Sequence, residues 1–166
     1  MNARYLRLFG SPSVEGGDGN ALTGRVTQRH RIALLALLAL APDQRLTRDK
    51  LIGHLWPESD AEHARNLLNV ALYNLRKALG EHALLSTGDD LTLNSELVRS
   101  DVAEFERAIE RGDHGDAVTL YRDPFLDGFF LNEAPEFDQW VDRERGRLAG
   151  EYDKSLEALA DSAESA

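Results

Sequence analysis

Apolar residues recur every three or four positions between residues 62 and 79, which predicts an amphipathic helix over this segment. At about 100° per residue, its apolar positions share one narrow arc that is expected to face a core. This arc consists of Ala64, Leu68, Ala71, Leu72, Leu75 and Leu79. The remaining surface lacks the mixture of Glu and Lys that surface helices usually carry, because no acidic residue occurs between Glu62 and Glu81.

Alternation, helical periodicity and capping residues predict the other elements of the first hundred residues. Thr27 and Thr47 are the expected N-caps of two further helices, Ser59 or Asp60 caps the third, and Gly80 ends it. A hairpin turn is expected at 88–90. In order, the predicted elements are strands at 5–9 and 13–15, helices at about 28–41, 48–56 and 61–79, and strands at 83–86 and 91–94. This is the order of a winged helix-turn-helix, a mainly α fold with small β-sheets that places its third helix in the major groove of DNA.

Three segments resemble a known family: ALLALLAL at 33–40, LTRDKLIGHLWP at 46–57 and ARNLLNVALYNLRKAL at 64–79. They look like the OmpR-type winged helix that opens the SARP-type (antibiotic-regulatory) transcriptional activators. The resemblance covers nearly all of residues 5–100. It implies that residues 1–100 form a winged-helix DNA-binding domain.

A second, helical unit is expected over residues 101–166. Asp101 is the expected N-cap of its first helix, which ends at Gly112. A second helix is expected at about 116–122, and a long third helix, with apolar residues mostly three and four apart, at about 136–160.

The segments 120–130 and 134–160 resemble the beginning of the bacterial transcriptional activation domain, which is a TPR-like helical array. Such an array buries its helix faces only against neighbouring repeats. We therefore expect an incomplete domain, either in a piece of a longer protein or in an unusually short family member. The uncovered apolar face of the 136–160 helix is a candidate surface for a homodimer or for packing within the chain.

The overall formal charge of −10 argues against nucleic-acid binding, but this charge is unevenly distributed. Residues 1–100 contain 12 basic and 11 acidic residues, a net charge of +1, whereas residues 101–166 contain 7 and 18, a net charge of −11. The acidity therefore belongs to the second unit, and a local positive surface remains possible on the first.

Composition excludes several classes of protein. The chain has no cysteine, which excludes disulfides and cysteine-based zinc sites and suits a reducing compartment. The longest apolar run, at 32–41, is too short to span a bilayer. The five histidines are scattered without metal-ligand spacing, and no P-loop, GxSxG or dinucleotide motif occurs. We therefore expect no enzyme activity, no cofactor, no metal and no membrane contact.

The polar arc of the 62–79 helix carries the candidate base-reading residues, namely Asn66, Asn69, Val70 and Tyr73. An asparagine amide forms a bidentate pair with adenine, and a valine contacts the methyl group of thymine. Tyr73 is better suited to a phosphate. The alternative is a solvated polar face, with Val70 as a single exposed apolar residue.

Long cationic side chains are the candidate phosphate contacts, because they need no exact register. Three lie on the 62–79 helix and three open the first helix. A cation at a helix N-terminus interacts unfavourably with the helix dipole, so its presence there suggests a role in binding an anion. The six are Arg65, Arg76, Lys77, Arg29, His30 and Arg31. The alternative for Arg76 and Lys77 is compensation of the helix dipole at the C-terminus.

Two further regions complete the expected site. In the wing, Thr87, Gly88 and Thr92 are candidate DNA contacts, although Asp89 and Asp90 occupy its tip and weaken the expectation of a basic wing. The loop before the third helix contacts RNA polymerase in OmpR-type regulators, so the resemblance gives Glu58 and Asp60 a polymerase-facing role. Simple N-capping is the alternative for both residues.

These observations predict a sequence-specific regulator that binds double-stranded DNA. The resemblance implies an activator that binds promoter direct repeats, recruits RNA polymerase and lies in the bacterial cytoplasm, associated with the nucleoid. The alternative is a protein-interaction module, a TPR-like adaptor whose winged helix does not bind DNA specifically.

Overall fold

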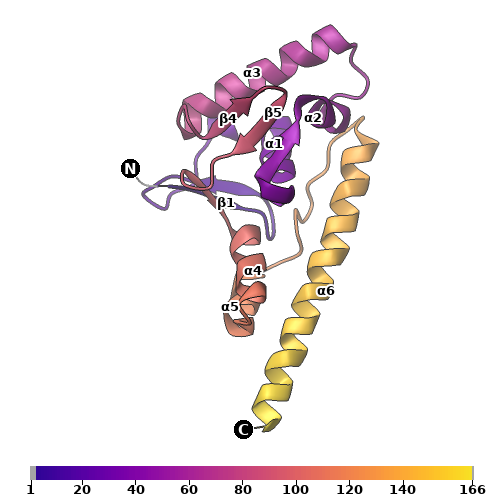
Figure 1. Cartoon of the computed structure of the whole chain (residues 1–166). Helices are drawn as coiled ribbons and strands as arrows, with labels where there is room; N and C mark the ends of the chain where they lie inside the picture. Colours follow the sequence, from indigo (N-terminus) through magenta and orange to yellow (C-terminus); the bar gives the residue numbers. More distant parts are fainter. Residues whose placement is uncertain (1–2, 166) are drawn as a thin grey trace.

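The structure, a computed structural model, describes residues 3–165 and is mainly helical with two small sheets (Figure 1). In the first sheet β1 pairs antiparallel with β2 and parallel with β6, in the order β2-β1-β6. The strands of this sheet are Arg4–Arg7 (β1), Ser13–Glu15 (β2) and Val98–Ser100 (β6). It joins residues from both ends of the predicted winged helix.

Three helices and a second antiparallel sheet follow β2. The helices are Arg29–Leu40 (α1), Arg48–Leu55 (α2) and Ala61–Leu79 (α3), with 3₁₀ turns at Gly24–Val26 (η1) and Pro42–Gln44 (η2). The second sheet has the order β3-β5-β4, from Arg45–Thr47 (β3), Leu84–Thr87 (β4) and Asp90–Leu93 (β5). This sheet is the wing, and it lies beside α3 (Figure 1).

The ends of α3 are set by its capping residues. The Asp60 carboxylate accepts a hydrogen bond from the backbone N–H of His63 at 2.8 Å, and Gly80 ends the helix with a φ of 115°. A side chain at Gly80 would be strained in that conformation. All six residues of the predicted apolar arc are buried, so the amphipathic pattern correctly predicted which side of this helix faces the core.

The second unit is helical, as expected. Asp101–Glu110 (α4) and His114–Leu120 (α5) form a helical hairpin, and Pro135–Ser165 (α6) packs against α5. Tyr121 at the end of α5 stacks on Tyr152 of α6 with ring centroids 4.3 Å apart. A helical hairpin followed by a packed third helix is consistent with a TPR-like arrangement.

Backbone hydrogen bonds join the helical unit to the first sheet. The connection between α5 and α6 runs back along the end of β1, where Leu126 N–H donates to the Leu8 carbonyl at 2.8 Å and Gly10 N–H donates to the Pro124 carbonyl at 2.9 Å. One continuous hydrophobic core therefore crosses residues 100 and 101, the boundary predicted from the sequence.

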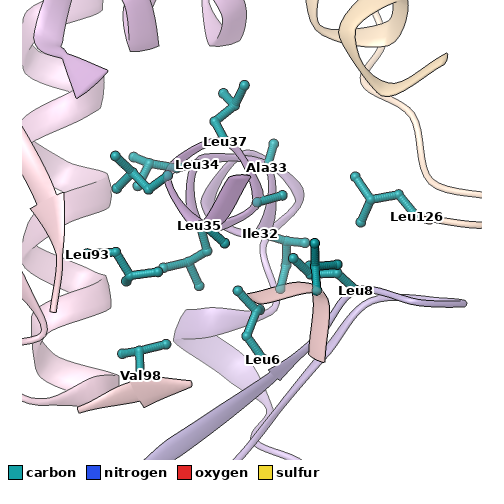
Figure 2. Close-up of a cluster of buried hydrophobic side chains, with 14 of the residues drawn as sticks. Leu6, Leu8, Ile32, Ala33, Leu34, Leu35, Leu37, Leu93, Val98 and Leu126 are labelled. Carbon is teal, nitrogen blue, oxygen red and sulfur yellow. The ribbon is translucent and has the colours of Figure 1, made fainter. Parts of the chain in front are cut away.

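The core is organised around α1, whose residues from Ile32 to Ala39 are all buried. A helix that is hydrophobic on every side is typical of a central position. Figure 2 shows α1 end-on, with Leu6 and Leu8 on one side, Leu93 on another, and Leu126 reaching it from the α5–α6 connection. This packing holds the wing, the first sheet and the helical unit around one helix.

Several local expectations were wrong. The N-cap of α1 is Gln28, whose side chain accepts from Arg31 N–H at 3.1 Å, while the Thr27 hydroxyl donates to the Gly24 carbonyl in η1. Ser100, not Asp101, caps α4. Strands β3 and β6 were not predicted, because each pairs with a strand that is distant in sequence and not with a hairpin neighbour.

The start of α5 also differs from the expectation. Asp113 caps α5, so this helix begins at His114, two residues before the expected start. Among residues 3–165, no helix is long and apolar enough to cross a membrane.

Candidate nucleic-acid interface

The exposed face of α3 carries the four residues predicted to read bases. Asn66 and Asn69 are exposed, Val70 is 53% exposed and Tyr73 is 57% exposed. A valine and a tyrosine with more than half of their surface in water give this side of α3 an exposed apolar component. The fold thus places these four side chains together, on the side of α3 that faces away from the core.

A groove of about 400 Å³ lies beside α3, where Arg48 and Arg76 connect this helix to the wing. We call it the wing groove, and it is lined by Arg48, Asn69, Leu72, Tyr73, Arg76, Lys77 and Glu81. Lys77 Nζ lies 5.4 Å from the centre of the Tyr73 ring, a cation–π contact that keeps the ammonium group next to the exposed ring. Three cations and one carboxylate give the groove a net positive lining, which suits a phosphate backbone.

Arg76 holds the wing against α3. Its Nε and Nη2 atoms donate to the Leu84 carbonyl at 3.1 and 2.9 Å, and Nη2 also lies 3.2 Å from the Ser86 hydroxyl. The guanidinium is therefore engaged within the chain, in contrast to the phosphate contact expected from the sequence. Its position still leaves a positive charge at the floor of the wing groove.

Arg48 connects the same two elements from the start of α2. Its backbone N–H donates to the Asp89 carbonyl at 2.9 Å, and its guanidinium lies 3.3 Å from Asn69 Oδ1 on α3 and 3.3 Å from Ser86 Oγ on β4. Two arginines thus share the Ser86 hydroxyl between α3 and the wing. Arg48 was not among the predicted site residues, because the pairing of β3 with β5 that brings it to the wing has no local pattern in the sequence.

The predicted wing residues lie on β4, on β5 and in the turn that joins these strands. Gly88, with a φ of 60°, occupies the first central position of the tight turn between β4 and β5, as a type II′ turn requires. Thr87 precedes the turn and is exposed, whereas Thr92 is half-buried on β5. Asp89 is exposed at the tip and also lines a second groove of about 370 Å³ that contains Arg65 and Asn69.

The α2–α3 loop presents both residues that were predicted to face RNA polymerase. Glu58 and Asp60 are exposed, and Asp60 also caps α3. Capping uses one carboxylate oxygen of Asp60, so Glu58 is the freer of the two acidic groups.

Comparison with known proteins finds a family match within the first unit. Residues 25–88 match a protein family described as transcriptional regulatory protein, C terminal. These residues are a domain of that family. They contain α1, α2, α3 and the β4–β5 turn, so the chain carries the winged-helix, DNA-binding domain of a transcriptional regulator. No curated protein matches the chain.

A solved structure supports the arrangement of the whole chain. The structure of Mycobacterium tuberculosis EmbR in complex with a low-affinity phosphopeptide is similar with a TM-score of 0.69 and 21% identity. The similarity covers 94% of this chain and 44% of that chain, so the chain spans less than half the length of EmbR. At this identity the likeness shows the fold, which includes both the winged helix and the helical region.

Within the transcriptional-regulator domain, the start of α1 lies apart from the wing groove. Arg29 donates from Nε and Nη2 to the Phe130 carbonyl at 3.2 and 2.9 Å and packs over the Phe129 ring at 5.0 Å. Its guanidinium therefore joins the regulator domain to the α5–α6 connection. The predicted phosphate contact of Arg29 would have to compete with these bonds.

The other two candidate residues at the start of α1 are partly buried. His30 stacks on Trp56 with ring centroids 5.5 Å apart and an angle of 6° between the planes. Partial burial lowers the pKa of His30, while a hydrogen bond to the Leu55 backbone opposes that shift, so the neutral ring is favoured. Arg31 is half-buried. The structure does not bring these residues together with Arg65 and Lys77.

Proposed function

We propose that this chain is a sequence-specific regulator that binds double-stranded DNA, with α3 in the major groove and the wing beside the adjacent backbone. The observation that carries the proposal is the exposed face of α3. It presents Asn66, Asn69, Val70 and Tyr73 without a single acidic residue between Glu62 and Glu81. Amides and small apolar groups recognise base edges, and the adjoining cations suit phosphates.

Phosphate binding in this proposal rests on Arg65 and Lys77. Both are exposed, they lie on either side of Asn69, and each lines one of the two grooves that border α3. Arg48 adds a third positive charge between them. Arg76 contributes charge and holds the wing, and the start of α1 is assigned to contacts within the chain.

The resemblance to SARP-type activators extends the proposal beyond DNA binding. We infer an activator that binds promoter direct repeats in the bacterial cytoplasm, associated with the nucleoid, and recruits RNA polymerase through Glu58 in the α2–α3 loop. Contact between two chains would use α6, where Leu156 is 42% exposed. A concentration-independent monomer mass in gel filtration would contradict this dimer.

Salt-dependent DNA binding tests the central proposal. Affinity for an operator selected from random duplexes should fall with salt, at a slope of about −0.9 per phosphate neutralised. The Arg65→Ala, Lys77→Ala double variant should reduce the magnitude of that slope by about 2. An Arg122→Ala, Arg143→Ala variant removes two exposed cations from the helical unit and should keep the wild-type slope.

The same experiment separates the alternative function. If wild-type protein selects no sequence, or if the Arg65, Lys77 variant binds as the wild type does, α3 is not the DNA-binding element and the interaction-module interpretation is favoured. Polymerase recruitment is tested separately by Glu58→Ala, which should lower transcription in a purified system while operator affinity stays unchanged.

A further inference from the structure

The side-chain amide of Asn69 is held in one orientation by Arg48. The guanidinium Nη1 of Arg48 lies 3.3 Å from Asn69 Oδ1. A guanidinium has five N–H donors and no acceptor, so the Asn69 atom that faces it must be the oxygen. The Nδ2 group, with its two hydrogens, then points away from Arg48 on the exposed face of α3.

Arg48 is itself fixed by the wing. It follows β3 directly, its backbone N–H donates to the Asp89 carbonyl at 2.9 Å, and its Nη2 atom lies 3.3 Å from Ser86 Oγ. Ser86 is in turn bonded to Arg76, which is anchored on the Leu84 carbonyl. The orientation of the Asn69 amide therefore depends on a chain of contacts through the wing.

Asn66 lies one helical turn before Asn69 and lacks this constraint. Among residues 3–165 its side chain has no hydrogen-bond partner, and it is exposed. Its amide can turn to match the adjacent acceptor and donor of adenine, N7 and N6. The two asparagines therefore differ in which atoms they offer to DNA, although the sequence alone predicts adenine for both.

We propose that Asn69 reads guanine, and that Arg48 is the positioning residue that gives it this preference. Guanine presents two adjacent acceptors, O6 and N7, in the major groove, which match the two hydrogens of Nδ2. Adenine presents a donor at N6, which would face the Nδ2 donor. The inference rests on the proposed function, because it requires α3 to lie in the major groove.

Selection from random duplexes with matched variants tests the inference. The position read by Asn69 is the one whose preference disappears in Asn69→Ala, and wild-type protein should favour guanine over adenine there by about tenfold. Arg48→Met releases the amide, which can then turn as the Asn66 amide does, so the preference at that position should shift from guanine to adenine. Asn69→Asp keeps the acceptor for Arg48 but removes both donors, so the preference should move from guanine to cytosine, which presents a donor at N4.

The position read by Asn66 is the internal control. It is identified by Asn66→Ala, and its adenine preference should be the same in wild-type protein and in Arg48→Met. Because Asn69→Asp tests the amide without altering Arg48, the inference stays testable if Arg48→Met fails to fold.

Three results would overturn the inference while leaving the proposed function intact: no position whose preference disappears in Asn69→Ala, adenine at the Asn69 position in wild-type protein, or an unchanged guanine-to-adenine ratio in Arg48→Met. A guanine preference that survives Asn69→Ala but disappears in Arg48→Met would mean that Arg48 reads the base directly. Failure of the proposed function is distinct, since no sequence would then be enriched at all.

Discussion

The exposed face of α3 and the junction between the winged helix and α4–α6 both contain charged side chains, but they use them differently. At the junction, Asp101, Arg145 and Arg29 bind backbone groups of other segments. On α3, Arg65 and Lys77 extend into solvent beside two grooves. The charges at the junction complete the fold, whereas those of α3 are available to a ligand.

This difference shows that residue type alone does not separate a structural charge from a binding charge. A buried backbone N–H or carbonyl without a partner costs about 1–3 kcal/mol, so removing its charged partner lowers stability. Removing an exposed cation leaves no group unsatisfied, so it lowers only the affinity for a polyanion. Substitutions in the two regions should therefore affect two different measurements.

Asp101→Ala should have the largest effect on stability. The buried carboxylate accepts from Leu8 N–H at 2.9 Å and from Phe9 N–H at 3.0 Å. Losing both acceptors should lower the free energy of unfolding by about 4 kcal/mol, measured by urea denaturation followed by far-UV circular dichroism. Asp101→Asn keeps one acceptor and should lose about half as much.

The matched control for Asp101 is Asp161→Ala, which removes an exposed carboxylate from α6 and should change stability by less than about 0.5 kcal/mol. Equal losses in the Asp101 and Asp161 variants would mean that the junction does not depend on these two hydrogen bonds. The distinction between the two regions would then lose its physical basis.

Arg145→Met should have the second-largest effect on stability. Arg145 donates from Nε to the Phe125 carbonyl and from Nη2 to the Leu126 carbonyl, both at 2.9 Å, and so fixes the α5–α6 connection to α6. Methionine keeps the apolar stem and removes both donors. This should lower the free energy of unfolding by about 2 kcal/mol in the same denaturation experiment. Arg143→Met, two residues earlier and exposed, should leave the unfolding midpoint unchanged.

The sequence predicted the α3 face well because amphipathic periodicity depends only on neighbouring residues. Leu68, Leu72 and Leu75 are buried, and Asn69 and Tyr73 are exposed, as that pattern requires. The wing hairpin and its Gly88 turn followed from equally local signals. Long-range pairing was not predictable in this way.

Contacts between distant segments account for what the sequence did not reveal. The parallel pairing of β1 with β6 and the pairing of β3 with β5 have no local signature, and they decide where Asp101 and Arg48 lie. Asp101 was read as an N-cap because aspartate commonly caps helices, but its carboxylate instead binds a segment more than ninety residues away. Arg29 was grouped with the DNA contacts for the same reason, since Phe130 is distant in sequence.

Arg29→Met and Lys77→Met provide a direct comparison of the two regions. Arg29→Met should lower the free energy of unfolding by about 1 kcal/mol, because it leaves the Phe130 carbonyl without its donor. Lys77→Met should leave stability unchanged, weaken operator binding several-fold and reduce the magnitude of the salt slope by about 1. If Arg29→Met instead reduces the salt slope with no loss of stability, the start of α1 is a DNA contact, as the sequence predicted.

His54 should produce the smallest effect, as a dependence of stability on pH at the junction between α2 and α6. Its Nδ1 atom is buried and, within residues 3–165, has no hydrogen-bond partner, and its ring lies 6.4 Å from that of Trp140. Burial lowers the pKa of His54 below its ordinary value of 6.5; nearby Glu136 opposes this shift, and Arg143 and Lys50 add to it.

Since the folded-state pKa of His54 lies below the unfolded value, the unfolded chain binds more protons as the pH falls below 6.5. Its contribution to stability is therefore present above that pH and is lost as the pH falls through the lowered pKa. His54→Leu removes the proton-binding group, so its unfolding free energy should change less between pH 7 and pH 5 than that of the wild type. His82→Leu, which removes an exposed imidazole, should follow the wild-type profile. If His54→Leu also follows it, the buried imidazole does not titrate differently in the folded chain, and the junction carries no pH sensitivity through this residue.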